Sequence, residues 1–259
     1  AGVCFKVLDN LSNGENISYI YGDITHSVTT AFSNSSSFSS VRLDKISIND
    51  YKLDFGLQYS YKFNKKHVLN FGAVYSLGHS VNGKGYKYNQ KWLNGADYPS
   101  TQTGDTITNA FSLPHTFGAG LTYVYDNRLT IGADFTYQQW EDAKFYNEKS
   151  YFSNRTKIAA GAEFVPNPYS RNYLKRVRYR VGGYYSDPYT KVDGQDGTRE
   201  YGVSAGFGFP LFQSKSILNI SGQYVRVSPK VKGMLEENYL KINIGLTFNE
   251  RWFMKWKVD

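Results

Sequence analysis

The sequence contains a single cysteine and no long hydrophobic run, and each shortage excludes a class of protein. With Cys4 alone, no disulfide can form within the chain, so a disulfide framework is excluded. No apolar run is long enough for a membrane-spanning helix, which excludes a helical membrane protein. The chain begins at Ala1 with no start methionine and no signal-like segment. We therefore expect a processed form or a part of a longer precursor.

The sequence also lacks a basic helix, although its formal net charge is +8. A basic protein that binds nucleic acid usually gathers Lys and Arg on one helix or one face. Here the basic residues are spread over turns and over the polar positions that alternate with apolar ones along the chain. The pattern therefore predicts no nucleic-acid partner.

Aromatic residues and glycine, in contrast, are abundant: 23 Tyr, 17 Phe and 24 Gly. Tyrosine is enriched where membrane proteins cross the lipid headgroups, and glycine suits a crowded or curved sheet. The mean hydropathy of −0.50 is compatible with a membrane barrel, because only alternate residues of its strands face lipid.

The clearest pattern runs from Tyr51 to Leu77. Apolar or aromatic residues occupy every odd position from Tyr51 to Phe63, and polar or small residues lie between them. After the break at 64–66 the alternation resumes, with Val74 as its one exception. Such strict period-two alternation predicts two long antiparallel strands joined by a tight turn.

The same alternation predicts nine strands from residue 50 onward. They cover 50–63, 67–79, 116–125, 129–140, 156–165, 177–186, 201–211, 217–227 and 239–248. Short or moderate turns at 64–66, 126–128, 166–175 and 212–216 alternate with longer loops at 80–114, 141–151, 187–198 and 228–237. Bacterial outer-membrane barrels show this asymmetry, with short periplasmic turns and long extracellular loops.

These observations predict an all-β fold, an antiparallel transmembrane β-barrel of at least ten strands. An N-terminal segment, residues 1–47, supplies a Ser-rich loop at 33–40 and at least one strand, with Gly2–Leu8 and Ile17–Tyr21 as candidates. Residues 48–259 supply the remaining barrel strands and loops. We expect an integral protein of the bacterial outer membrane, surrounded by its lipid, with the C-terminus in the periplasm.

Charged residues of both signs lie in the inward phase of the predicted strands. Counting from the turns places Glu163 opposite Arg178 and Asp134 about opposite Lys157, with Arg180 and Glu200 in the same phase on neighbouring strands. Opposite charges on facing positions pair, and charges inside a barrel pair or meet water. We favour the interpretation of a cross-braced lumen wall over that of a polar translocation path.

The longest loop, 80–114, carries an aromatic set that is a candidate for contacting a ligand or a partner: Tyr86, Tyr88, Trp92 and Tyr98. A loop that only covers the extracellular end of the barrel, with no binding role, is equally compatible with this composition. His79 and His115 flank the loop without nearby acidic ligands, so we expect no metal site. No base is oriented toward a nucleophile. The sequence therefore predicts no enzyme, no catalytic residue and no cofactor.

Three segments resemble outer-membrane proteins of the Bacteroidota that are grouped with the FadL/TodX family of long-chain fatty-acid transporters. They are Asn49–Gln58 (NDYKLDFGLQ), Arg178–Tyr185 (RYRVGGYY) and Phe248–Phe253 (FNERWF). The resemblance covers about residue 47 to the end. It implies a fourteen-stranded FadL-like barrel if the chain is a partial one, with an N-terminal hatch and a lateral opening near a kinked strand.

The resemblance implies FadL-like passage of a hydrophobic compound through the barrel and out laterally as the leading function, with a hydrophobic small molecule as ligand. The inward faces, however, consist mostly of Gly, Ser, Thr, Asn and charged residues. The alternative is a non-transporting accessory or scaffold subunit of a larger outer-membrane complex, such as a protein assembly or export machine. Its partners are then other outer-membrane proteins.

Overall fold

The computed structural model describes residues 1–33, 37–93, 96–98, 106–145, 149–192, 194–211, 216–230 and 236–248. This part of the chain is mostly antiparallel β-sheet with two short 3-10 helices, η1 (Trp140–Asp142) and η2 (Tyr173–Arg176). No helix in it is long and apolar enough to cross a membrane.

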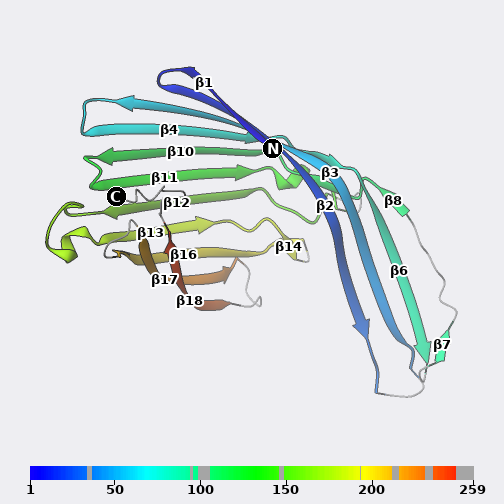
Figure 1. Ribbon diagram of the computed structural model, residues 1–259. Helices are drawn as coiled ribbons and strands as arrows, with labels where there is room; N and C mark the ends of the chain where they lie inside the picture. Colours follow the sequence, from blue (N-terminus) through cyan, green and yellow to red (C-terminus); the bar gives the residue numbers. More distant parts are fainter. Residues whose placement is uncertain are drawn as a thin grey trace, which may run out of the picture.

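Eleven strands follow one another in a curved wall that forms the barrel (Figure 1). In spatial order they are β1 (Gly2–Leu8), β2 (Leu11–Thr30), β3 (Ser39–Lys62), β4 (His67–Ser76), β10 (Thr116–Tyr125), β11 (Leu129–Gln138), β12 (Arg155–Phe164), β13 (Arg178–Ser186), β16 (Thr198–Pro210), β17 (Ile217–Pro229) and β18 (Glu237–Thr247). Every neighbouring pair is antiparallel, as β10 and β11 are from Thr116 opposite Gln138 to Tyr125 opposite Leu129. Within the described residues, β1 and β18 are the ends of the wall.

The nine strands predicted from residue 50 onward are confirmed. Their ends differ from the predicted ones by at most three residues, except that the first strand, β3, already begins at Ser39. The alternation marked them because each strand has one face toward lipid and one toward the lumen. Leu121, opposite Ala133, and Ile131, opposite Tyr123, are each 47% exposed although they are apolar. Ten residues of β10, at roughly 3.4 Å each and a tilt of about 40°, cross roughly 26 Å. That height matches the apolar band of an outer-membrane barrel.

The N-terminal segment is more regular than the sequence indicates. β1 covers the predicted Gly2–Leu8, but β2 runs from Leu11 to Thr30 instead of ending at Tyr21. β2 pairs with β3 without a register shift, from Leu11 opposite Tyr59 to Thr30 opposite Ser40. β3 therefore crosses residues 47 and 48 without a break. Of the Ser-rich stretch, residues 34–36 lie outside the described part.

The predicted loop 80–114 is wrong as a loop, because much of it forms strands. They are β5 (His79–Val81), β6 (Gly83–Leu93), β7 (Ala96–Tyr98), β8 (Thr106–Thr108) and β9 (Phe111–Leu113). β6 pairs with the first half of β3, from Ser39 opposite Trp92 to Ile48 opposite Gly83. The second half of β3, from Asp54 onward, pairs with β4. Pairing with β3 orders a segment that has no apolar face of its own.

β3 thus has two successive partners, and the sheet forks where it changes from one to the other. The branch made of β2 from Asp23 to Thr30, β3 from Ser39 to Ile48, and β6 sweeps away from the wall, and we call it the arm (Figure 1). Two glycines stand at its base. Gly22 has φ +150°, and a Cβ on Gly83 would lie 2.6 Å from the carbonyl oxygen of Ser47. A side chain at Gly83 would therefore collide with the neighbouring backbone.

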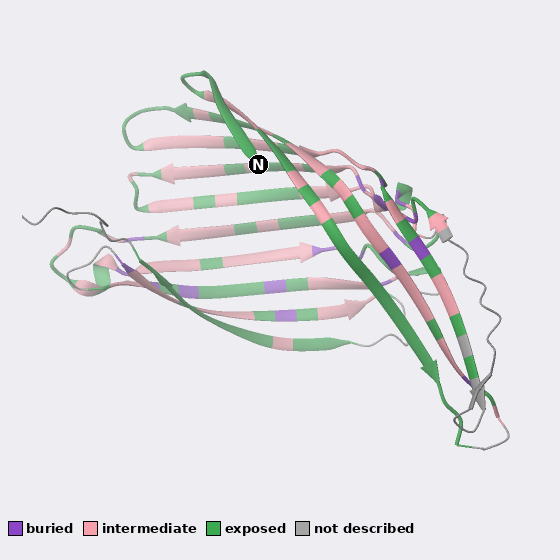
Figure 2. Cartoon of the chain, turned by 45° about the vertical axis from the view of Figure 1, so that its right-hand side comes forward, coloured by how far each residue is buried: buried purple, intermediate pink, exposed green. Residues whose placement is uncertain are grey.

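Several of the best-buried apolar residues lie near the base of the arm and in the long connections. Ile46, Val81, Ala110 and Ala143 are each at most 2% exposed. Figure 2 shows the wall strands alternating between exposed and intermediate residues, while β2 is exposed along most of the arm. A small packed core therefore stands outside the lipid-facing wall, at the end of the barrel that carries the long loops.

Candidate functional site

The connections at the long-loop end pack into an ordered aromatic cluster. The ring centroid of Trp140 lies 5.3 Å from that of Phe152 and 5.1 Å from that of Tyr189. Phe145 lies 6.1 Å from Phe152, and Phe111 lies 6.4 Å from Trp140. Offset and edge contacts at these separations favour aromatic packing. The rings come from three connections, so the cluster ties them together.

Backbone hydrogen bonds join the same connections. The amide of Ser112 donates to the carbonyl of Lys144 at 3.0 Å, and the amide of Ser153 donates to that of Tyr189 at 2.8 Å. We call this unit the loop platform: β5, β9, and the described residues of 139–154 and 187–197. These connections are therefore ordered by contacts with one another.

A polar latch closes the platform on the next hairpin. Asp196 accepts a hydrogen bond from the Ser153 hydroxyl at 2.6 Å and one from the Lys230 ammonium at 2.9 Å. Lys230 also lies 3.7 Å from Asp187. The bond from Ser153, followed by that from Lys230, holds the pKa of the Asp196 carboxyl below its usual range. The latch therefore depends on an ionised Asp196.

The arm is seated on the platform through apolar contacts. Ile46 of β3, which is 1% exposed, forms a core with Ala110. Ile48, Ile107, Phe111 and Phe145 pack against this pair. Because Ile46 lies on the face of the arm that turns toward the platform, its burial fixes how the arm leaves the barrel.

Above this seat, a cleft of about 810 Å³ lies between the arm and the platform. It is lined by Ile24, His26, Val28, Thr30, Ser40, Arg42, Asp44, Ile46, Lys87, Asn89, Phe145 and Tyr151. One side consists of alternate residues of β2, β3 and β6, and the other of aromatic side chains of the platform. Its volume is within the range of pockets that hold ligands or peptide segments.

The aromatic set predicted in loop 80–114 lies on the arm. Tyr86 and Tyr88 of β6 are opposite Lys45 and Leu43 of β3, on the face that turns away from the cleft. The backbones of Trp92 and Tyr98 belong to β6 and β7, and their side chains lie outside the described part. The structure thus assigns the four residues to strands.

The inward face of the wall carries the predicted charges, with Glu163 at their centre. Its carboxylate accepts hydrogen bonds from Arg178 Nη1 at 2.8 Å and from Arg180 Nε at 2.6 Å. Arg180 Nη1 also donates to Asn219 Oδ1 at 2.7 Å. In register, Glu163 stands opposite Arg180 rather than the expected Arg178, since the turn η2 lies in the intervening connection. One carboxylate therefore bridges two guanidinium groups.

Asp134 and Lys157 do not face each other as expected. Asp134 is opposite Ala159 and Lys157 is opposite Thr136, because the connection runs from 139 to 154 and shifts the facing positions by two residues. The Asp134 carboxylate lies over Gly120, and Lys157 Nζ lies 5.4 Å from the ring centroid of Tyr184. Glu200 and Arg180 lie in the same phase on neighbouring strands, and Glu200 accepts a hydrogen bond from the Tyr184 hydroxyl.

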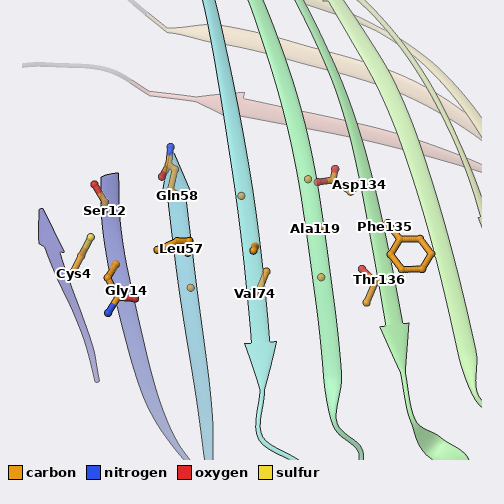
Figure 3. Close-up of a pocket in the computed structure, with 16 residues that line it drawn as sticks. Cys4, Ser12, Gly14, Leu57, Gln58, Val74, Ala119, Asp134, Phe135 and Thr136 are labelled. Atoms are coloured by element: carbon orange, nitrogen blue, oxygen red, sulfur yellow. The ribbon is translucent and has the colours of Figure 1, made fainter. Parts of the chain in front are cut away.

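A shallow groove of about 390 Å³ crosses the inward face over β1, β2, β3, β4, β10 and β11 (Figure 3). Its floor is made largely of glycines on neighbouring strands, Gly14, Gly56, Gly72, Gly118 and Gly120. Val74, the exception to the alternation, stands between Gly56 and Gly118 and is 53% exposed. The Val74 side chain thus stands above a floor that is largely glycine backbone, with Asp134 and Thr136 also lining the groove.

The two histidines that flank the predicted loop have separate partners. His115 Nδ1 lies 2.8 Å from the Tyr75 hydroxyl, and the ring of His79 stacks on Tyr51 at 4.8 Å. The expectation of no acidic neighbour is wrong for His79, because its Nε2 lies 3.4 Å from Asp50 Oδ2. Among the residues that the structure describes, no group of three or more His, Cys, Asp or Glu side chains comes together.

Sequence reasoning missed the platform and the cleft. The density of aromatic residues in the connection 140–152, with Trp140, Phe145, Tyr151 and Phe152, was a signal that could have identified an ordered loop. The cleft had no such signal, since it depends on the pairing of β6 with β3.

Solved structures with a similar fold include a FadL homologue and two toluene transporters. The chain is similar to a Pseudomonas aeruginosa FadL homologue (18% identity, TM-score 0.52, 88% of this chain and 58% of that chain). It is also similar to the toluene transporters TbuX of Ralstonia pickettii (11%, 0.57, 96% and 66%) and TodX of Pseudomonas putida (15%, 0.55, 95% and 66%). Identities this low establish the FadL-like fold alone.

The chain spans 58 to 66% of the length of these three transporters. No curated protein sequence matches it. A family model, in contrast, matches residues 1–259 and is described as BamG. With its FadL-like wall of antiparallel strands and its ordered long-loop end, the chain belongs to the BamG family of outer-membrane barrel proteins.

Proposed function

We propose that this protein is a non-transporting accessory subunit of a larger outer-membrane complex, and that it binds partner proteins through its long-loop end. The observation that carries the proposal is the arm seated on the loop platform by the core of Ile46 and Ala110. Long loops without a role in binding do not need a packed core of their own, since loops that face water are usually mobile and polar. Membership of the BamG family supports this role.

The inward face favours an architectural wall over a path for apolar molecules. The carboxylate of Glu163 is used by Arg178 and Arg180, and the described groove is floored by glycine backbone. Apolar ligands bind in pockets lined mainly by apolar and aromatic side chains. In the orientation that we propose, the short turns and the C-terminus face the periplasm, and the platform and the arm face outward.

Gentle detergent extraction of the protein from its native membrane, followed by native mass spectrometry, tests this proposal. We expect a stoichiometric set of other outer-membrane proteins with no apolar molecule in the lumen. A monomer in every mild detergent tried would refute the accessory role. A matched extraction of an unrelated, monomeric barrel from the same membrane controls for proteins that co-extract through shared lipid.

One observation favours FadL-type transport of a hydrophobic compound as the second candidate. Val74 projects from the glycine floor of the groove, where a small apolar molecule could contact it. The same mass spectra test this function, because they would contain a monomer that carries an apolar molecule. Val74→Asp should then remove that molecule, while Val181→Ala, on the outward face, should leave it in place.

A further inference from the structure

The cleft between the arm and the platform has the chemistry of a protein-binding groove. We propose that it receives an extended, acidic segment of a partner protein. This inference rests on the proposed accessory function and names the surface and the kind of partner. The groove is formed by Ile24, Val28, Arg42 and Lys87 of the arm and by Phe145 of the platform.

The spacing of the lining residues matches an extended polypeptide. Ile24, His26, Val28 and Thr30 are alternate residues of β2, and they lie on the cleft face of the arm. Alternate residues of a strand repeat every roughly 7 Å, which is the repeat of side chains on one face of any extended chain. A segment laid along β2 can therefore present successive side chains to successive positions of the groove, as in other modes of strand recognition.

The apolar positions supply anchoring contacts. Ile24 and Val28 are each 47% exposed on a part of the arm that stands outside the lipid-facing wall. Phe145 and Tyr151 face them from the platform, with ring centroids 5.5 Å apart. Aliphatic side chains opposed by aromatic rings in a concave site are typical of the centre of a protein interface.

The charges of the groove are mainly positive. Arg42 and Lys87 line the groove, and Lys91 lies on the same face, opposite Ser40. The one carboxylate among the lining residues is that of Asp44. The Arg42 side chain is 59% exposed although its Nε lies 3.3 Å from Asp44 Oδ2. Its guanidinium has further donors, so it can bind a second carboxylate while it keeps the first. The excess of positive charge selects an acidic partner.

Asp44 adds a more specific requirement. Its Oδ1 is buried and has no hydrogen-bond partner among the described residues. A buried acceptor without a donor is costly, and a donor supplied by a bound segment removes that cost. The segment we expect therefore combines Asp or Glu side chains, near Arg42 and Lys87, with one hydroxyl, amide or amine donor near Asp44.

Site-specific photo-crosslinking in cells that contain the full protein tests this assignment. The photoreactive residue p-benzoylphenylalanine replaces Val28 in the cleft, or Thr25 on the opposite face of the arm as the matched position. We expect Val28 to crosslink one protein partner, and peptide mapping to place the crosslink in a segment with more acidic than basic residues. Thr25 should give at most a trace of that product.

Charge-reversal variants test whether the crosslink depends on the positive charges of the cleft or only on a partner lying nearby. Arg42→Glu combined with Lys87→Glu should lower the yield of the Val28 crosslink about tenfold, since two attractive contacts become repulsive. Lys84→Glu, on the opposite face of the arm, should leave the yield unchanged. The intact heat-modifiable migration of each variant confirms that the barrel is folded.

Other occupants would overturn the inference. These include a second copy of this chain, a polysaccharide or lipid adduct, a protein segment that is not acidic, and no crosslink at all. If native mass spectrometry still finds a stoichiometric complex in the charge-reversed variant with an unchanged crosslink, the cleft assignment fails and the accessory function stands. If wild-type protein is a monomer, the accessory function itself fails.

Discussion

Removal of the Glu163 carboxylate is the sharpest perturbation of the inward wall. In Glu163→Ala, Arg178 and Arg180 lose the acceptor that they share at 2.8 and 2.6 Å. A protected hydrogen bond to a charged group contributes roughly 1.5–3 kcal/mol, and an exposed ion pair roughly 0.2–1 kcal/mol. The side chains are 27% exposed for Glu163 and 40% and 39% for the arginines, so solvent screens the pairs in part. We therefore expect the free energy of unfolding to fall by about 1 kcal/mol for each lost bond, about 2 kcal/mol in total.

Urea unfolding of the protein in lipid vesicles, followed by heat-modifiable migration in gels, measures this loss. With a denaturant slope of roughly 2 kcal/mol per molar, the midpoint should fall by about 1 M. Glu163→Gln should lose less, because its amide oxygen still accepts one hydrogen bond. The double variant Glu163→Ala/Arg180→Ala should lose less stability than the sum of the two single variants. The reason is that Arg180→Ala removes one of the two like charges that Glu163→Ala leaves unpaired. A midpoint equal to that of the wild type, with unchanged migration, would refute the bridging role of Glu163.

Three further outcomes follow from the long-loop end. Gly83→Ala should detach the base of the arm, because its Cβ would lie 2.6 Å from the Ser47 carbonyl; limited proteolysis should then cut the arm while the barrel stays folded. The ion pair of Asp196 and Lys230 should contribute its full stability above the ordinary aspartate pKa. This stability should be lost as pH falls through the lowered pKa of Asp196, because the carboxylate is then protonated. Hydrogen exchange of the platform amides should become faster over that pH range. Trp140→Ala should loosen the platform at neutral pH and lower its exchange protection by about 2–3 kcal/mol.

The wall could be predicted from the sequence because the membrane imposes a simple pattern on it. β10 has the predicted bounds, Thr116–Tyr125, since each alternate residue faces lipid and the turn at 126–128 is polar. Beyond Tyr21 the same strand logic fails for β2. Its outward residues there are Asp23, Thr25, Ser27 and Thr29, which face water, so the alternation of apolar residues disappears while the strand continues.

The parts that sequence reasoning missed depend on partners distant in the chain. β6 has only Gly, Lys and Asn from residue 83 to 91 on its cleft face, and Lys84 shares the other face with Tyr86 and Tyr88, so its ladder with β3 is what makes it a strand. The pairing of charges failed for a related reason: a shift of two facing positions separates Asp134 from Lys157, and turn composition does not determine such a shift. For Glu163 the facing residue changed, but the long side chains of both arginines still reach its carboxylate.

Because β3 pairs with both the wall and the arm, the arm is held at one end only and moves with the wall. One uninterrupted strand, Ser39–Lys62, belongs to the membrane wall at one end and to the arm at the other, so the two share a stiff beam. From the fork at Ile48 to Ser39 the arm extends roughly 30 Å at about 3.3 Å per residue. A tilt of about 10° at the fork then moves its tip by about 5 Å, given that lever length. A slight change in the curvature of the barrel at the fork would thereby be magnified into a larger displacement at the tip of the arm.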